Sequence, residues 1–190
     1  MSFIVSIGAA FLGAATWTFL EYGMHRFLGH DRRTYPNPVA SEHIRHHSEG
    51  DYFAPTRKKA LVAVAAFVVV GALAAVVVGL THGPVYAMSL VAMYVTYEVI
   101  HRRAHTHHGV GAYGRFIRRH HFHHHFVNPH ANHGVTTPFW DVVFGTLEPP
   151  GRVRVPEKLQ MPWLVDPATG DVRAEHQASY ELVRSRQATP

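Results

Sequence analysis

The sequence contains no cysteine in its 190 residues, and this absence excludes disulfides and thiolate metal ligands. Any bound metal must therefore be held by histidine or carboxylate side chains. Lysine and arginine are also absent from two long stretches, residues 1–24 and 60–100, so all 18 basic residues lie outside them. The length is enough for one domain.

The stretches without basic residues are also the apolar ones. Residues 60–80 ("ALVAVAAFVVVGALAAVVVGL") run for 21 residues without a charge, close to the about 20 that cross a hydrocarbon core as a helix. The segment "THGP" at residues 81–84 is predicted to break this run, and a second apolar run follows over residues 85–99. A further apolar run covers residues 3–20, for which a cleaved signal peptide is the alternative. Together they predict an all-α integral membrane protein with about three transmembrane helices.

Three spans place both basic segments on the same membrane face. By the positive-inside rule, that face is cytoplasmic and the N-terminus lies outside. The net charge of +5 then indicates a basic surface beside anionic lipid headgroups. No nucleic-acid recognition motif accompanies this charge, so nucleic acid is not an expected partner.

Histidine is in excess, with 18 copies, many of them in four clusters. Two clusters, "HRFLGH" and "HRRAH", directly follow apolar runs, and two, "HIRHH" and "HHFHHH", contain the pattern H-x-x-H-H. On a helix, positions i, i+3 and i+4 share one face, so each H-x-x-H-H is predicted to direct three imidazoles toward one point. The pair in "HRFLGH" is five residues apart and does not share a face of a regular helix. We therefore expect His30 at a helix end or a bend.

All four clusters can converge just below the membrane surface, as a cytoplasmic histidine-rich helical cap. Ten imidazoles suit two metal ions better than one, and neutral nitrogen ligands suit iron, copper, zinc or nickel. A purely structural zinc site usually takes four ligands. The last cluster satisfies H-x-x-H-H in two registers, because either His120 or His121 can begin it.

Two carboxylates and one further histidine are predicted to support the ligands. Glu98 lies three residues before His101 and Glu21 four before His25, so each shares a helical face with a ligand and is placed to accept its second ring N–H. The alternatives are that both carboxylates reach the headgroups, or that Glu98 is itself a ligand. His133 is the third supporting candidate.

The motifs together resemble those of the fatty acid hydroxylase superfamily, which includes fatty acid 2-hydroxylases and sterol desaturases. The matching stretches are "WTFLEYGMHRFLGH", "EHIRHH", "YEVIHRRAH", "RRHHFHHHF" and "NHGVTTPFWDVVFGT". The resemblance implies two iron ions, which zinc can replace on purification, and O₂ as co-substrate. The family's spacing back from "GVTTPFWD" also selects the register of the last cluster. The ligand set is then His25, His30, His43, His46, His47, His101, His105, His121, His124 and His125.

The function implied is hydroxylation, or desaturation, of a lipid C–H bond, with a fatty-acyl chain as the leading substrate. The chain contains no haem-binding module, so the electrons are expected from a separate cytochrome b5- or ferredoxin-like carrier and its reductase. Arg26, Arg102 and Arg103 are candidates to anchor an anionic headgroup, or are ordinary positive residues of the membrane face. Residues 1–148 are predicted as the membrane hydroxylase domain and residues 149–190 as a cytoplasmic tail, either a cap or a loose end.

Two alternatives stay open. The first keeps the chemistry and changes the substrate to a carotenoid or a sterol-like molecule. The second is a non-enzymatic, histidine-rich membrane protein that binds or moves metal ions.

Overall fold

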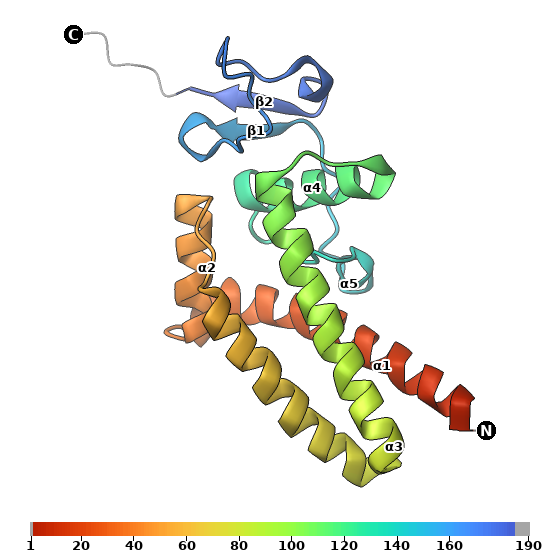
Figure 1. The fold of residues 1–190 in the computed structure, drawn as a ribbon. Helices are drawn as coiled ribbons and strands as arrows, with labels where there is room; N and C mark the ends of the chain where they lie inside the picture. Colours follow the sequence, from red (N-terminus) through yellow and green to blue (C-terminus); the bar gives the residue numbers. More distant parts are fainter. Residues whose placement is uncertain (1, 185–190) are drawn as a thin grey trace.

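The computed structural model describes residues 2–184, and helices dominate this part of the chain (Figure 1). The helices are α1 (Ser2–Gly23), α2 (Pro38–Glu49), α3 (Thr56–Thr106), α4 (Gly111–Phe126) and α5 (Phe139–Val143), and the strands are β1 (Val153–Pro156) and β2 (Tyr180–Val183). Shorter helical segments are the π-helical η1 (Met24–Gly29) and the 3-10 turns η2 (Arg32–Thr34), η3 (Glu157–Leu159) and η4 (Ala174–His176).

Two helical stretches of the described chain are long and apolar enough to cross a membrane, Phe3–Gly29 and Thr56–Thr106. Only 11% and 6% of their most apolar windows are buried inside the protein, so these side chains face outward. Phe11, Val76 and Leu80, for example, are 76–86% exposed. Apolar surfaces of this extent need a covering of lipid or of another protein, and together with the helix lengths they indicate a membrane protein.

The helix α3 bends back on itself at Gly79 to form two arms. Gly79 has φ 85° and ψ 162°, a backbone conformation that favours glycine because it lacks Cβ. The bend therefore comes two residues before the predicted break at residues 81–84, and Pro84 lies within the second arm.

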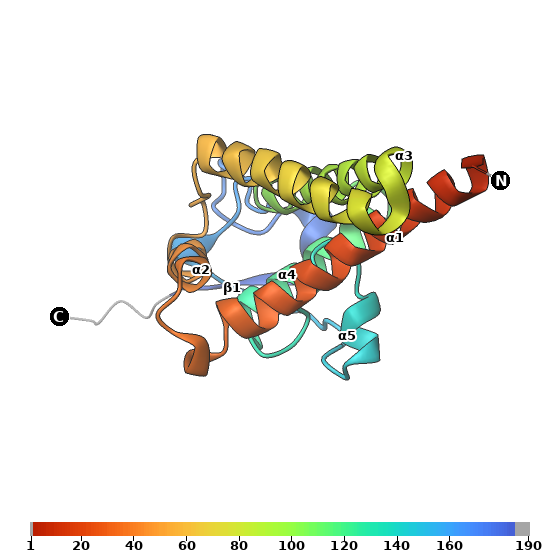
Figure 2. The same cartoon turned by 90° about the horizontal axis from the view of Figure 1, so that it is seen from below.

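The helix α1 packs against α3 and crosses it at an angle (Figures 1 and 2). Trp17 of α1 lies against Tyr94 and Tyr97 of the second arm, with ring centroids 4.8 and 5.7 Å apart. The Ser89 hydroxyl donates to the carbonyl of Ala10 at 2.6 Å. Aromatic contacts and polar side chains that bond across helices thus hold the apolar part together.

The segments that carry the ten predicted ligands lie away from the bend of α3. These segments are η1, α2, the C-terminal end of α3, and α4 (Figure 1). The sequence placed the histidine clusters at one end of the apolar runs, and the fold has the same arrangement.

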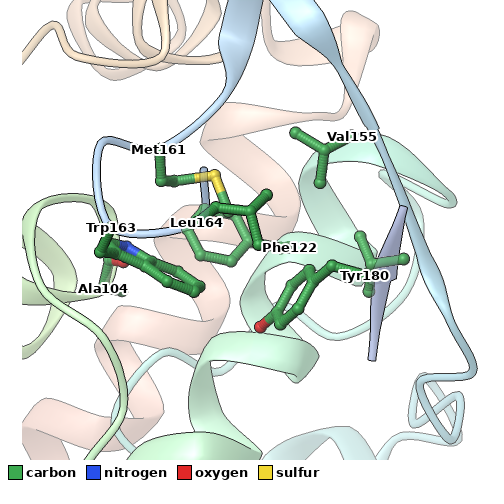
Figure 3. Packing of buried hydrophobic residues seen from close by; sticks show 8 residues of the cluster. Ala104, Phe122, Val155, Met161, Trp163, Leu164 and Tyr180 are labelled. Carbon is green, nitrogen blue, oxygen red and sulfur yellow. The ribbon is translucent and has the colours of Figure 1, made fainter. Parts of the chain in front are cut away.

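Residues 149–184 form a C-terminal cap over α4 and the end of α3. The strands β1 and β2 pair in parallel, with Val153 opposite Tyr180. Phe122 of α4 and Trp163 of the cap are buried in the same cluster (Figure 3), and the Trp163 indole donates to the Ala104 carbonyl at 2.9 Å. Over its described residues, the predicted tail is therefore a packed cap and not a loose end.

The cap also corrects the all-α prediction, which included no strands. Each strand has four residues, too few for a periodic pattern that is recognisable in a sequence. Residues 185–190 of the predicted tail lie outside the described residues.

Candidate metal centre

The ten predicted ligands come together as two groups of five histidines. Within each group, one candidate ligand nitrogen of every histidine lies within 4.8 Å of the others. The first group is His25, His30, His43, His47 and His124, and the second group is His46, His101, His105, His121 and His125. Every predicted ligand belongs to one of them.

Each H-x-x-H-H cluster contributes to both groups, which differs from the prediction that it converges on one point. On α2, His43 and His47 join the first group, whereas His46 joins the second. On α4 the numbers are exchanged, because His124 joins the first group whereas His121 and His125 join the second. Neighbouring residues point about 100° apart around a helix, so His46 and His47 face different groups.

A π-helical segment brings His25 and His30 into the same group. The segment η1 continues α1 over Met24–Gly29, and His30 caps its end, which confirms the expected helix end or bend. Backbone hydrogen bonds in a π-helix link residues five apart, so His25 and His30 lie on one side of the chain. Asn37 stabilises this irregular end, because its amide donates to the Leu28 carbonyl at 3.0 Å while its oxygen caps α2.

Burial keeps the imidazoles neutral. It lowers the pKa of His30 and of His46 to about 4 and the pKa of His47 to about 3, and neighbouring imidazoles add to the effect on His47. Burial and crowded imidazoles also hold the pKa well below its usual value for His43, His121, His124 and His125. A neutral imidazole has a free lone pair, so these side chains are ready to bind metal at neutral pH.

The ring nitrogens of each group face one another. Two nitrogens bound to one ion at about 2.1 Å and at right angles lie about 3 Å apart, so the spacing fits a shared ion in each group. The Nε2 atoms of His25 and His47 are buried and have no hydrogen-bond partner among the described residues. A donor set of imidazole nitrogens suits iron or zinc. The Nε2–Nε2 distances are 2.8 Å for His30–His124, 2.7 Å for His43–His30, 2.9 Å for His101–His46 and 2.9 Å for His105–His121.

Backbone carbonyls orient three of the predicted ligand rings. The Nδ1 atoms of His25 and His124, both in the first group, donate at 2.5 and 2.7 Å to carbonyls of the loop over residues 131–136. In the second group, Nδ1 of His46 donates to the Tyr52 carbonyl at 2.8 Å. Because a carbonyl only accepts, each contact places the proton on Nδ1 and leaves the Nε2 lone pair for a metal.

The two predicted carboxylates do not accept from ligand rings. Glu21 accepts instead from the N–H groups of Val135 and Thr136, at 2.6 and 2.9 Å, and from the Thr136 hydroxyl at 2.7 Å. The change from α1 to η1 alters the register between Glu21 and the histidines that follow it. Glu98 pairs with Lys59 on the other arm of α3, since a cation attracts it more strongly than a neutral imidazole does.

Asp141 is a buried residue outside the set of predicted site residues. Its oxygens accept from the N–H groups of His133 and Gly134 at 2.8 and 2.9 Å, from the Thr146 hydroxyl at 2.8 Å and from the His120 ring at 3.2 Å. Burial raises the pKa of Asp141, but these hydrogen bonds outweigh burial and hold the pKa below its usual value. In the sequence, only the position of Asp141 within the matching stretch "GVTTPFWD" pointed to this residue.

The other predicted or surplus histidines lie around the groups. His133 lies beside His25, with ring centroids 5.4 Å apart, and burial lowers its pKa to about 4. His120 and His123 of α4 belong to neither group, because His120 bonds Asp141 and His123 bonds Glu148 at 2.9 Å.

The three arginines that were predicted to bind a lipid headgroup do not lie together. Arg26 donates to the Tyr22 hydroxyl at 2.7 Å, and Arg102 lies over the ring of Phe53, 5.2 Å from its centroid. Arg103 is exposed. Arg26 and Arg102 line different cavities.

A cavity of about 590 Å³ reaches both histidine groups, and we refer to it as the main cavity. His43 of the first group and His46 and His101 of the second line it. Leu61 and Val62 of α3 also line it, and they are 71% and 59% exposed on the apolar surface. The main cavity therefore connects the apolar outer surface with both groups.

A second hollow, of about 840 Å³, reaches the first group but none of the second-group histidines. Arg26, Arg32 and Arg33 line it together with His30 and His133. We refer to it as the arginine hollow. Asp31 also lines the hollow and pairs with Arg33, which leaves Arg26 and Arg32 in excess, whereas both lysines of the main cavity, Lys58 and Lys59, are paired with glutamates.

Comparison with known proteins gives one consistent family. Residues 10–146 match the model of the fatty acid hydroxylase family. The ceramide very long chain fatty acid hydroxylase scs7 of Schizosaccharomyces pombe is 32% identical over 154 residues, covering 77% of this chain and 44% of that protein. The dihydroceramide fatty acyl 2-hydroxylase FAH2 of Arabidopsis thaliana is 32% identical over 145 residues, covering 71% of this chain and 58% of that protein.

A solved structure agrees with these sequence matches. The structure of full-length scs7p, in which only the hydroxylase domain is visible, aligns with a TM-score of 0.57 and 27% identity, over 77% of this chain and 59% of that chain. The chain covers only 44% and 58% of the length of these two curated relatives. The match of 137 residues to the family model nevertheless covers most of the sequence. The chain belongs to the fatty acid hydroxylase family.

Proposed function

We propose that this protein hydroxylates a C–H bond of a membrane lipid, with a fatty-acyl chain as the substrate. The observation that carries the proposal is the meeting of ten imidazoles, in two groups of five, with a cavity open to the apolar surface. The names of the relatives, which are hydroxylases of ceramide and fatty acids, support the same reaction.

Two iron ions are the proposed cofactor, one held by each histidine group. When bound, they would supply the insertion of one oxygen atom of O₂ into the C–H bond, while two electrons and two protons convert the other atom to water. The protein keeps the ligand imidazoles neutral by burial and orients the rings of His25, His124 and His46 through backbone carbonyls.

The main cavity is the proposed lipid site. Leu61 and Val62 line its outer part, so an acyl chain can enter from the bilayer, and Tyr94 and Tyr97 extend the wall toward His101. This arrangement orients the chain and excludes water from the carbon that reacts.

The proposed membrane arrangement has three spans, α1 and the two arms of α3. The N-terminus lies outside, and the histidine groups and the C-terminal cap face the cytoplasm, because the basic residues flank that side. Residues 1–148 then form the hydroxylase domain and residues 149–190 a cytoplasmic extension, of which residues 149–184 cover the domain.

A separate electron carrier, cytochrome b5- or ferredoxin-like and served by its own reductase, is the proposed partner. The arginine hollow supports an approach of this carrier, because it is basic and reaches His30 of the first group.

Comparative lipid and pigment profiling of cells with and without the gene tests the proposal. Fatty-acyl lipids heavier by one oxygen atom are the expected result. The same gain on a carotenoid or a sterol would assign the alternative substrate. Unchanged lipids together with altered cellular zinc or nickel would favour the metal-binding alternative. Iron analysis of the purified protein tests the cofactor separately, with zinc measured in parallel because it can substitute.

A further inference from the structure

One loop orients two ligands of the first histidine group. The carbonyl of His133 accepts from Nδ1 of His25, and the carbonyl of Ala131 accepts from Nδ1 of His124. The rings of His25 and His124 are in contact, with centroids 4.4 Å apart. A shift of this loop would therefore turn both rings at once.

Two buried carboxylates from different helices fix that loop. Glu21, near the end of α1, is 4% exposed and accepts the N–H groups of residues 135 and 136 at 2.6 and 2.9 Å. Asp141 of α5 is fully buried and accepts the N–H groups of residues 133 and 134 at 2.8 and 2.9 Å. Hydrogen bonds from backbone N–H to a buried carboxylate are strong, so four successive loop residues are held at defined positions.

The segment that orients the second group has, among the described residues, no carboxylate that accepts its backbone N–H groups. In this group, the ring of His46 is oriented by a hydrogen bond from its Nδ1 to the Tyr52 carbonyl. Glu42 accepts only from side chains, the Tyr52 hydroxyl and Lys58, and Glu98, three residues before His101, pairs with Lys59. The two groups therefore differ in what positions their ligands.

We propose that Glu21 and Asp141 are positioning residues for the first histidine group, acting through the loop over residues 131–136. Their loss would weaken metal binding at the first group and leave the second group loaded. This inference rests on the proposed two-metal site and adds to it a division of labour between the groups.

The two carboxylates differ in whether an amide can replace them. Oε1 of Glu21 accepts both of its backbone N–H groups, and Oε2 accepts only the Thr136 hydroxyl. A glutamine can keep Oε1 in place and donate to that hydroxyl, because a hydroxyl also accepts. Asp141 accepts a backbone N–H on each oxygen, from His133 on Oδ1 and from Gly134 on Oδ2, so an asparagine must point its NH₂ at one of these donors.

Metal analysis of the purified, iron-loaded protein tests the proposal. We expect two ions per chain in the unaltered protein, and about one in Asp141→Asn and in Glu21→Ala, because losing such supporting contacts typically lowers metal affinity about 10- to 100-fold. Glu21→Gln should keep two ions. Glu98→Gln is the matched control, since it changes a carboxylate near a ligand without touching the loop, and it should also keep two.

Cobalt(II) substitution identifies which ion is lost. The visible absorption that disappears in Asp141→Asn should match the part lost in His25→Ala and differ from the part lost in His105→Ala. A general loss of folding would instead remove both parts together.

Several results would overturn the inference alone, in an unaltered protein that holds two ions. The first is that Asp141→Asn and Glu21→Ala both keep two bound ions. The second is that metal is lost equally from both histidine groups. The third is that Glu98→Gln loses as much metal as Asp141→Asn. An unaltered protein that binds no metal would overturn the proposed function first. If Asp141→Asn does not accumulate, Thr136→Val removes one bond to Glu21, and a chelator should then extract one ion about tenfold faster than the other. Equal extraction rates would overturn the inference.

Discussion

The two histidine groups contain five histidines each and are built by different means. The second group takes four of its five histidines from i, i+4 pairs on the regular helices α3 and α4. The first group depends on the π-helical η1 and on a loop that orients two rings. The comparison teaches that helical periodicity suffices for one half of this centre, whereas the other half needs irregular backbone held by specific side chains.

Breaking either group should have the largest effect. His124→Ala removes a ligand of the first group, and His121→Ala removes one of the second, three residues earlier on the same helix. Since the proposed reaction needs both ions, we expect no detectable hydroxylated product from either variant and a loss of about one bound ion from each. Lipid profiling and metal analysis measure both.

His123→Ala is the control for these variants. It lies on α4 between the two ligands, belongs to neither group and bonds Glu148. Full product from His124→Ala or His121→Ala would contradict the two-metal centre, as would complete loss of product in a well-folded His123→Ala.

A smaller change can disturb the irregular group selectively. Gly29 ends η1, and a Cβ there would lie 3.0 Å from the ring of His43, so Gly29→Ala pushes against a ligand of the first group. We expect about tenfold weaker binding of one metal ion, within the range for disturbed ligand surroundings, and unchanged binding of the other. Titration with iron or cobalt(II) measures the two affinities. Gly23→Ala is the matched control, because no atom lies within 4 Å of a Cβ at Gly23.

These differences also explain how much the sequence could predict. Helix class, apolar arms and the ten clustered histidines follow from composition and from spacing, and the family resemblance resolved the register of the last cluster. The bend at Gly79 was predicted two residues late, because "THGP" is the more conspicuous breaker. Glu98 was matched to a ligand by its helical spacing, but Lys59 is 39 residues away in the sequence, and spacing along one helix does not reveal such a partner.

Contacts between distant segments are the part that could not be predicted. Glu21 bonds a loop more than 100 residues later, and Asp141 bonds backbone N–H groups that carry no side-chain signal. The C-terminal strands are too short for a pattern, and their packing on Phe122 is visible only in the fold. Local rules thus predicted the ten clustered histidines and named Glu21, but they missed Asp141 and the loop that Glu21 contacts.

The main cavity touches both groups, so filling it should affect them together. Val62→Trp adds bulk at the lining while leaving every histidine in place. We expect KM for the lipid to rise about tenfold, or the rate to fall by a similar factor, with both metal ions retained. Val69→Trp is the control, because Val69 is 56% exposed on the same arm of α3 and does not line the main cavity. Equal activity in Val62→Trp and Val69→Trp would place the lipid elsewhere.

The arginine hollow touches only the first group, and this difference gives the smallest predicted effect. Arg32→Glu reverses an exposed charge in the hollow without changing a ligand. Charges at the rim of an interface mainly change association rates, so we expect about a three- to tenfold higher KM for an acidic electron carrier, with a weaker dependence on salt. Turnover with a small chemical reductant should stay unchanged, since it needs no protein docking. Arg154→Glu, in the C-terminal cap and away from the hollow, should leave both rates unaltered. If Arg32→Glu and Arg154→Glu respond alike to the carrier, electrons do not enter through the side of the first group, and the two groups differ only in how they are supported.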